Sequence, residues 1–187
     1  MKHNLTAKYK HVLLRPVQKD DLESLRIWRN DKERTPYLSK IDYITSEMQL
    51  AWYERDLTDT NCYTLAIEEC EKLNSIIGSV ALYNFKESRV EFGRALIGHT
   101  EARGKGMGFL ATVLCLYIGF TAFDVDRIVA SVHEDNLAAI KAYEKSGFVV
   151  VGKHLYEHGG FELEIVAPKT DFFKKHDFLN EIIGGVI

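Results

Sequence analysis

Cysteine and proline are scarce in this sequence, with three residues of each among 187. The cysteines, Cys62, Cys70 and Cys115, are odd in number and include no C-x-x-C spacing. Such a set indicates neither a disulfide framework nor a zinc site. We therefore expect reduced thiols and no bound metal.

Long apolar runs and an excess of basic residues are also lacking. The longest apolar-rich segment, 109–123, is too short for a membrane span and contains Thr112, Gly119 and Thr121. The first residues are polar, which predicts no signal peptide. The net charge of −3 and the isoelectric point near 6.2 argue against general nucleic-acid binding. The expectation is a cytoplasmic protein that binds neither membranes nor nucleic acid.

Glycine is concentrated in one stretch, RGKGMG at residues 103–108. It lies between an apolar strand expected at 90–98 and a helix expected at 109–120, where apolar residues recur with helical spacing. A glycine-rich turn at that place directs backbone N–H groups and the positive end of the helix toward one point. It suits an anion such as a pyrophosphate, although three glycines would also fit a flexible connection or a plain helix start.

The glycine stretch departs from two well-known nucleotide motifs. A dinucleotide-binding fingerprint would need glycine where Phe109 stands, and a P-loop would need serine or threonine where Gly106 stands. The pattern that fits is Arg-x-x-Gly-x-Gly, read at Arg103, Gly106 and Gly108. It resembles the acyl-CoA loop of the GNAT N-acetyltransferase superfamily.

A second stretch strengthens this resemblance. Residues 136–148 read N-x-x-A-x-x-x-Y-x-x-x-G-F, which is similar to the second half of the GNAT signature. Asn136 is expected to start a helix that ends at Gly147, a residue suited to a left-handed C-terminal cap. The two motifs occur in the family's order, with a helix and a strand between them.

The remaining sequence predicts the other elements. Strands are expected at 11–16, 62–68, 75–83, 90–98, 128–133, 148–151 and 161–167. Helices are expected after Asp20 or Asp21, after a capping box of Ser46 and Gln49, at 109–120 and at 136–147.

This order of elements resembles the GNAT topology, which implies a mixed α/β (α+β) fold. The central sheet would be mostly antiparallel, with about seven strands splayed between the fourth and the fifth, and with about four flanking helices. We expect a single GNAT acetyltransferase domain over residues 1–187, with terminal extensions at 1–10 and 169–187. The second extension has helical potential and could pack on the domain or on a second copy.

The resemblance implies acetyl-CoA as co-substrate and no metal. By position, the backbone of Leu96, Ile97 and Gly98 would bind the pantetheine arm. Asn136 would hold the same arm and also cap its helix. The pyrophosphate would lie on the loop, where glycine permits a positive φ and a close approach of the ligand. The loop residues are Arg103, Gly104, Lys105, Gly106, Met107, Gly108 and Phe109.

The resemblance also implies how the chemistry is divided. Tyr143 would protonate the departing sulfur, although a tyrosine on a helix can equally be a core aromatic. The amine must lose a proton, so a base is required. Glu91 stands on the strand that lines the splay and is the candidate, but a register slip of one residue would turn it away. His133, at the end of the neighbouring strand, is the alternative, and His99 is expected to border the phosphate loop.

The acceptor is expected to contact the N-terminal helices and the last turn. Residues 25–31 resemble the GNAT branch of ribosomal-protein alanine, spermidine and amino-sugar acetyltransferases, and the substrate-binding candidates are Trp28, Arg29 and Asn30. A polyamine would need an acidic pocket, for which the candidates are Glu68, Glu69, Glu71, Glu157, Glu162 and Glu164. A nucleotide sugar would need cations, for which the candidates are Arg26, Arg29 and Arg34. Each set could equally be surface charge.

Together these features predict an acetyl-CoA-dependent N-acetyltransferase that moves the acetyl group directly to a primary amine in a ternary complex. The expected acceptor is a small molecule such as an amino sugar, an amino-sugar nucleotide or a polyamine. The alternatives are a protein N-terminal acetyltransferase of the ribosomal-protein type, a non-catalytic acyl-CoA sensor and a nucleotide-binding protein unrelated to CoA. The resemblance also favours a homodimer.

Overall fold

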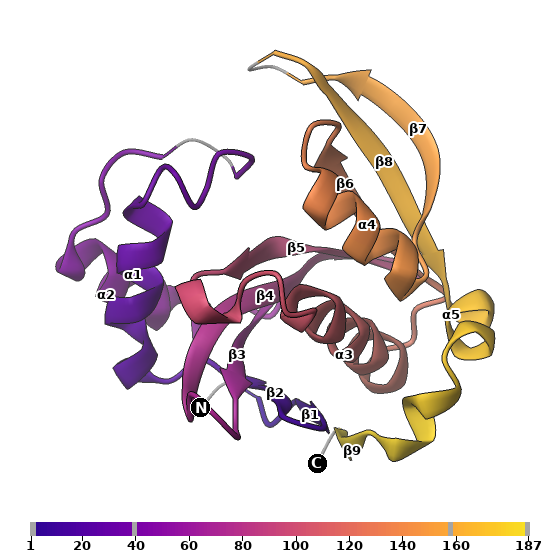
Figure 1. Cartoon of the computed structure of the whole chain (residues 1–187), viewed down its shortest axis with the longest axis horizontal. Helices are drawn as coiled ribbons and strands as arrows, with labels where there is room; N and C mark the ends of the chain where they lie inside the picture. The colour runs from indigo at the N-terminus through magenta and orange to yellow at the C-terminus, as the bar shows by residue number, and fades with distance from the viewer. Residues whose placement is uncertain (1–2, 39–40, 157–158, 186–187) are drawn as a thin grey trace.

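The computed structural model describes residues 3–38, 41–156 and 159–185 and folds them around one mixed sheet (Figure 1). Within these residues the strand order is β7-β8-β6-β5-β4-β3-β2-β1-β9. Neighbouring strands pair antiparallel except β5 and β6, which pair parallel. The predicted fold class is confirmed, with nine strands in the sheet rather than about seven.

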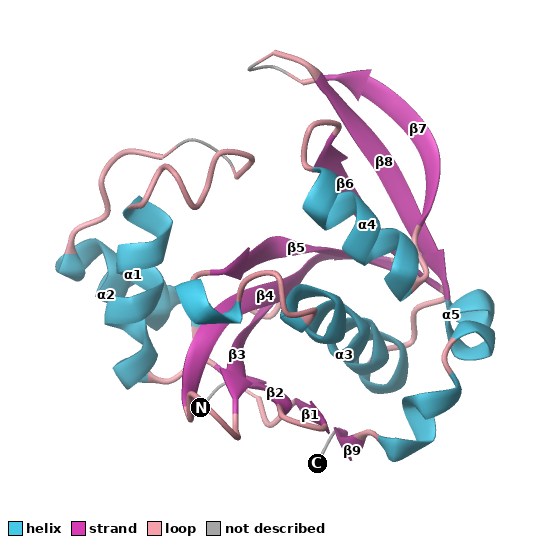
Figure 2. Ribbon diagram, viewed as in Figure 1, coloured by secondary structure: helices cyan, strands magenta, loops and turns pink. Residues whose placement is uncertain are grey.

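The elements are drawn by type in Figure 2. The strands are β1 (Thr6–Tyr9), β2 (Val12–Pro16), β3 (Cys62–Glu69), β4 (Ser75–Lys86), β5 (Arg89–Ile97), β6 (Arg127–His133), β7 (Val149–Leu155), β8 (Phe161–Pro168) and β9 (Ile183–Gly185). The α-helices are α1 (Leu22–Asn30), α2 (Ser46–Asp56), α3 (Met107–Ala122), α4 (Leu137–Ser146) and α5 (Lys169–Lys175). Across the described ranges, none of the helices combines the length and apolar composition needed to cross a membrane.

Helices cover both faces of the sheet. α3 is apolar on nearly every side and is buried against one face, where Leu82 of β4 and Phe92 of β5 belong to the same core. On the other face, Leu25 of α1 packs with Ala66 of β3. Leu65, the neighbour of Ala66, belongs to the α3 core because successive side chains of a strand point to opposite faces. Two helix layers therefore enclose the sheet, with α1 and α2 on one side and α3 and α4 on the other.

β5 and β6 separate soon after they begin to pair. Their parallel pairing ends at Glu91 and Val129, and no further pair joins these two strands within the described part of the chain. The pairing of β5 with β4 is also interrupted, by a bulge at Arg94, whose φ of 51° is positive. Residues 92–97 of β5 therefore have a free edge, which is the predicted splay.

Both segments that were expected to be terminal extensions pack into the fold. Thr6–Tyr9 forms β1, which pairs with β2 and with β9 near the C-terminus. Phe172 of α5 is fully buried, and its ring centroid lies 5.3 Å from that of Phe120 in α3. The C-terminal tail therefore packs on its own domain.

The helix ends follow local signals closely but not perfectly. Gly147 ends α4 with a left-handed φ of 109°, as predicted. The capping box predicted for α2 is wrong by one residue, because Thr45 rather than Ser46 is the N-cap. The Thr45 side chain accepts a hydrogen bond from the Met48 N–H at 3.2 Å, and Gln49 is buried.

Candidate active site

The turn before α3 directs a set of backbone N–H groups away from the protein core. Gly104 and Gly106 have left-handed φ angles of 70° and 80°, which favour glycine. Within the described residues, the N–H groups of 104–109 donate no hydrogen bond, and the first helical bond runs from Leu110 to the Gly106 carbonyl. The positive end of the α3 dipole adds to the attraction for an anion. This turn has the geometry of an anion-binding site.

Two details of the loop differ from the sequence prediction. The Arg103 N–H is not free, since it donates to the Thr100 carbonyl at 3.2 Å, and its Nε donates to the Ile97 carbonyl at 3.0 Å. Gly108 has no positive φ because it lies in the first turn of α3. A Cβ on Gly108 would approach Ile97 at 3.8 Å. Arg103 thus ties the loop to β5, while the exposed Lys105 adds positive charge to it.

The end of β5 contributes backbone to the splay. Leu96 and Ile97 pair with β4 along one edge. The Gly98 N–H donates to the Ile77 carbonyl at 2.8 Å, and the Gly98 carbonyl accepts from the guanidinium of Arg34. Both polar backbone groups of Gly98 are therefore bonded already, and the Ile97 carbonyl accepts from Arg103, so less of this strand end is free than the sequence predicts.

α4 brings two predicted residues to the α3 side of β5. Asn136 caps the helix, and its side chain accepts from the Ala139 N–H at 3.2 Å. The Tyr143 ring meets Phe92 edge-on, with centroids 5.5 Å apart, and its hydroxyl has no hydrogen-bond partner among the described residues. Burial raises the pKa of Tyr143 to about 12. The phenol is therefore protonated near neutral pH and can serve as an acid.

Glu91 lies on the opposite face of β5 from Tyr143. Its neighbour Phe92 points toward α4, and successive side chains alternate along a strand. The Tyr83 hydroxyl donates to Glu91 Oε1 at 2.8 Å, and Asn84 Nδ2 donates to Oε2 at 3.0 Å. Burial, and then the hydrogen bond to Glu91, raise the pKa of Tyr83. The carboxylate is thus held in a fixed orientation on the α1 and α2 side.

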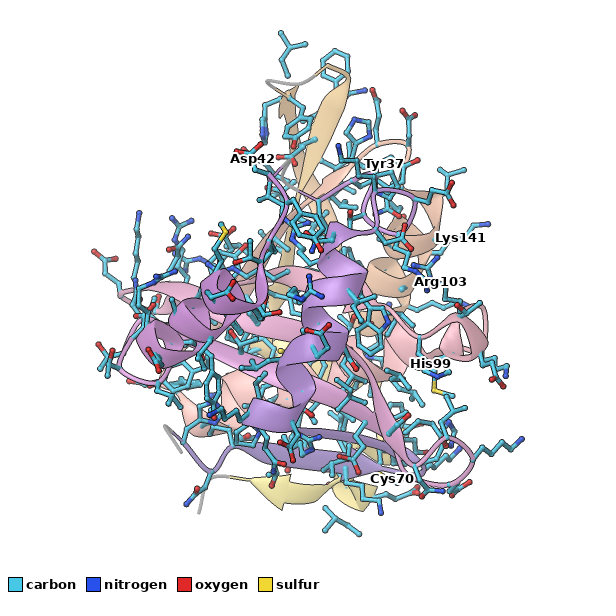
Figure 3. All side chains as sticks on the ribbon, turned by 90° about the vertical axis from the view of Figure 1, so that its left-hand side faces the viewer. Tyr37, Asp42, Cys70, His99, Arg103 and Lys141 are labelled. Carbon is cyan, nitrogen blue, oxygen red and sulfur yellow. The ribbon has the colours of Figure 1, made fainter. Side chains whose placement is uncertain are left out.

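Both ring nitrogens of His133 are engaged. Nδ1 accepts from the Asp135 N–H at 3.2 Å, and Nε2 lies 3.3 Å from the Gly159 carbonyl, so the proton is on Nε2. The ring stacks on Tyr37, with centroids 5.3 Å apart, which joins β6 to the segment between α1 and α2. Tyr37 is labelled in Figure 3. The one acceptor nitrogen of His133 is therefore occupied, whereas each carboxylate oxygen of Glu91 accepts one hydrogen bond and keeps a second lone pair. His99 precedes the loop, and its buried Nδ1 has no partner in the described ranges.

The three acceptor candidates on α1 have different surroundings. Trp28 packs against Gly98, where an added Cβ would lie 2.0 Å from the indole. Asn30 donates to and accepts from the backbone of Ile44, at 2.9 and 2.8 Å, and so fixes the segment between α1 and α2. Arg29 is partly buried, and burial lowers the pKa of its guanidinium. Trp28 and Asn30 thus make packing and hydrogen-bond contacts within the fold, and Arg29 places a partly buried guanidinium in the last turn of α1.

Several of the acidic candidates for a polyamine pocket are bound elsewhere. Glu68 pairs with Arg15 at 2.6 Å. Glu69 accepts hydrogen bonds from the backbone N–H groups of 71–73, which lowers its pKa. The remaining candidates are Glu71, which is exposed, Glu162 and Glu164, which flank His154, and Glu157, which lies outside the described residues.

Two of the cationic candidates are also engaged. Arg26 donates to Glu23 at 2.7 Å and to the Tyr43 hydroxyl at 3.0 Å on the surface of α1. Arg34 pairs with Asp31 at 2.5 Å. The cation that sequence reasoning missed is Arg94, at the bulge of β5, because nothing in the local sequence predicts a bulge there.

A model of the acetyltransferase (GNAT) domain matches residues 11–149 of this chain. The chain belongs to the GNAT acetyltransferase family. Membership confirms the resemblance drawn from the two motifs and identifies the protein as an acetyl-CoA-dependent N-acetyltransferase. It also agrees with the strand–loop–helix arrangement at residues 89–122.

Curated relatives and solved structures within this family are distant. The spermidine N(1)-acetyltransferase of Escherichia coli K12 is 26% identical over 146 residues, covering 78% of this chain and 77% of its own. The N-acetyltransferase 9-like protein of Caenorhabditis briggsae is 25% identical with the same coverage. The spermidine N-acetyltransferase of Vibrio cholerae, in complex with CoA and spermine, superposes with a TM-score of 0.78 at 22% identity, covering 87% of this GNAT chain and 98% of its own. At that identity the superposition supports a shared fold alone.

Proposed function

We propose that this GNAT enzyme transfers the acetyl group of acetyl-CoA directly to the primary amine of a small molecule, in a ternary complex with both substrates. Acetyl-CoA would lie on the α3 and α4 side of β5, and the amine would enter from the α1 and α2 side. The observation that carries the proposal is the free edge of β5 at 92–97, flanked by Tyr143 on one face and Glu91 on the other.

The residues of the loop suit the acyl carrier. The free N–H groups of 104–109 would bind its pyrophosphate, with Lys105 adding charge. The free edge of β5 offers backbone groups to the amides of the pantetheine arm. Asn136, the N-cap of α4, would contact the same arm. The thioester would then lie in the splay, within reach of both faces of the sheet.

The chemistry needs one base and one acid. The amine nitrogen attacks the acetyl carbonyl carbon, and the carbon–sulfur bond breaks as the new carbon–nitrogen bond forms. Glu91 would accept the proton that the amine loses, directly or through water, and Tyr143 would give its proton to the sulfur. The nitrogen of an ammonium acceptor loses two protons: Glu91 would take the first and pass it to solvent, and the second would return through water to the Tyr143 phenolate. The products are then an N-acetylated amine, free CoA thiol and one proton, which balances atoms and charge.

Two structural relatives favour a small acceptor. One is the V. cholerae enzyme, whose structure holds spermine. The other is an aminoglycoside acetyltransferase in complex with coenzyme A and kanamycin, with a TM-score of 0.71, 19% identity and coverage of 87% of this chain and 98% of its own. Both ligands are small amines, which is the acceptor size we propose here.

A Glu91→Gln variant tests the base. We expect kcat at neutral pH to fall by about 100-fold, a typical contribution of general base catalysis. The deficit should narrow toward pH 10, because an alkyl ammonium with a pKa of about 10.4 then loses its proton without help. The measurement is a pH profile of CoA thiol release for both proteins. A deficit that stays constant with pH would assign Glu91 a structural role instead.

The transfer itself is tested by thiol release and mass spectrometry across an acceptor panel. The panel contains polyamines, amino sugars, amino-sugar nucleotides, aminoglycosides and peptides with N-terminal alanine. We expect a small amine to gain one acetyl group and initial rates to show intersecting lines, as direct transfer requires. Binding of acetyl-CoA without turnover of any amine would favour a sensor, and acetylation of the peptides alone would favour the protein N-terminal enzyme.

A further inference from the structure

A surface cavity of about 440 Å³ lies beside the first turn of α3. Residues from three helices line it, namely Phe109, Glu144, Lys145, Lys175 and His176. Glu144 and Lys145 belong to the last turn of α4, and Lys175 ends α5, which lies beside that end of α4 (Figure 1). The volume is within the range of small-molecule sites.

The cavity adjoins the proposed pyrophosphate site through Phe109. The Phe109 N–H is one of the loop groups that donate no hydrogen bond to another described residue, and its side chain lines the cavity. A pyrophosphate on the loop would therefore have the cavity directly beside it. In acetyl-CoA the pyrophosphate joins the pantetheine arm to an adenosine that carries a 3′-phosphate. That end of the molecule needs cations for its phosphate and a flat apolar surface for its base.

Two lysines bring positive charge to the cavity. Within the described ranges, neither Lys145 nor Lys175 forms an ion pair with a carboxylate. Lys175 Nζ donates to the Glu144 carbonyl at 2.9 Å, and a Cβ on Gly147 would lie 3.8 Å from Lys175 Cδ. An ammonium has three N–H donors, so Lys175 is held in place and keeps two donors for an anion. The single carboxylate of Glu144 leaves the lining with a net positive charge.

Two rings supply the flat surface. The centroids of Phe109 and His176 lie 6.1 Å apart, and His176 Nε2 lies 3.1 Å from the Ser146 carbonyl, which fixes the imidazole. Burial lowers the pKa of His176, so this ring is neutral near pH 7. Purine bases stack on aromatic faces with little demand on hydrogen bonding. Cations and rings in one cavity match a phosphorylated nucleoside.

We infer that this cavity binds the adenosine 3′-phosphate end of acetyl-CoA, with Lys145 and Lys175 at the phosphate and the rings of Phe109 and His176 at the adenine. The inference rests on the proposed transferase function and extends the co-substrate site beyond the loop. The helix α5 lies outside residues 11–149, which match the GNAT domain model. Lys175 and His176 are therefore additions that this chain makes to the matched domain.

Calorimetric titration of the full chain with CoA and with dephospho-CoA tests the inference, because the two ligands differ only in the 3′-phosphate. Hydrogen bonds to a charged group predict that CoA binds about 10-fold more tightly or better. The preference should shrink as salt is added, since the lysines are exposed.

The variants Lys175→Gln and Lys145→Gln should each weaken CoA binding by about 3- to 10-fold and leave the affinity for dephospho-CoA nearly unchanged. Lys175→Arg should keep the preference, because it keeps the charge. Lys174→Gln is the matched control, since Lys174 is exposed in the same turn of α5 but does not line the cavity. It should bind both ligands as wild type does. Melting temperatures report any loss of the hydrogen bond that Lys175 gives to α4.

Three results would overturn the inference while leaving the transferase proposal intact. They are equal wild-type affinities for CoA and dephospho-CoA, a preference for CoA that both lysine variants retain in full, and an equal loss on both ligands in Lys175→Gln. The last result would assign Lys175 only the capping of α4. A wild-type protein that binds neither CoA nor dephospho-CoA would instead overturn the transferase proposal, and this inference with it.

Discussion

A Tyr143→Phe variant is expected to lower kcat by about 100-fold or more, because general acid catalysis contributes roughly two to four powers of ten. The phenol is the acidic group that α4 brings to the free edge of β5, beside Phe92. Its hydroxyl makes no hydrogen bond to another described residue, so its loss removes no structural contact. Acetyl-CoA affinity and melting temperature should therefore stay near the wild-type values.

The pH dependence gives this prediction a second readout. Burial disfavours the phenolate and raises the pKa of Tyr143 to about 12, whereas an ordinary tyrosine ionises near pH 10. The acid form therefore persists through pH 10, and kcat should show no fall there that is due to this residue. A wild-type enzyme that loses activity near pH 10, with the loss absent in Tyr143→Phe, would contradict the raised pKa.

Tyr117→Phe is the matched control for that substitution. Tyr117 lies on α3 and packs against Phe173 of α5, with ring centroids 6.5 Å apart. It also loses one hydroxyl and should keep kcat unchanged. Retention of full activity by Tyr143→Phe would show that another group, or water, protonates the sulfur.

The parts of the site that could be predicted from sequence are those determined by local backbone chemistry. A helix that starts at Asn136 and ends at Gly147 needs only an N-cap and a residue that tolerates a left-handed φ, and both residue types can be recognised in the sequence. The same holds for Gly104 and Gly106, whose positive φ angles are needed in the turn. These two segments also carry the family motif, so the fold and the family could both be predicted from the sequence.

The parts that could not be predicted depend on pairing between distant strands. The bulge that turns Arg94 exists because β4 and β5 pair out of register on its two sides, and arginine does not favour the φ of 51° found there. The face of Glu91 was ambiguous for the same reason, since one residue of slip reverses it. The contact between Trp28 and Gly98 joins residues 70 positions apart, so the packing of Trp28 on the end of β5 could not be predicted from the sequence around either residue.

The strands at one edge of the sheet also depend on pairing between distant segments. β1 and β9 are short, and β9 is held by its pairing with β1, which pairs with β2 on its other edge. No local signal connects Thr6–Tyr9 to Ile183–Gly185, so the sequence alone predicts extensions at both ends. Tertiary pairing, rather than propensity, decided these strands.

A Gly106→Val variant is expected to weaken acetyl-CoA binding by at least about 100-fold. Gly106 is the N-cap of α3 with φ of 80°, a region that a β-branched residue does not adopt. Valine would force the peptide units on either side to rotate, which turns their N–H groups away from a bound pyrophosphate. Two lost hydrogen bonds to a charged group, at about 1.5 to 3 kcal/mol each, account for that factor.

The fold should survive this change. A Cβ on Gly106 would have no described atom within 4 Å, so no side chain is displaced. The remaining cost is the backbone strain, about 1 to 2 kcal/mol, or a few degrees of melting temperature for a chain of this size. Calorimetric titration with acetyl-CoA and a thermal melt measure the two effects separately.

Gly159→Val separates strain from ligand binding. Gly159 also has a positive φ, 98°, and a Cβ there would also meet no described atom within 4 Å, but it lies in the turn between β7 and β8. It should lose similar stability and keep wild-type affinity for acetyl-CoA. Equal loss of affinity in both variants would point to general destabilisation. Unchanged affinity in Gly106→Val would mean that the diphosphate binds elsewhere, because no other described helix start combines free N–H groups, paired left-handed glycines and a neighbouring unpaired strand edge.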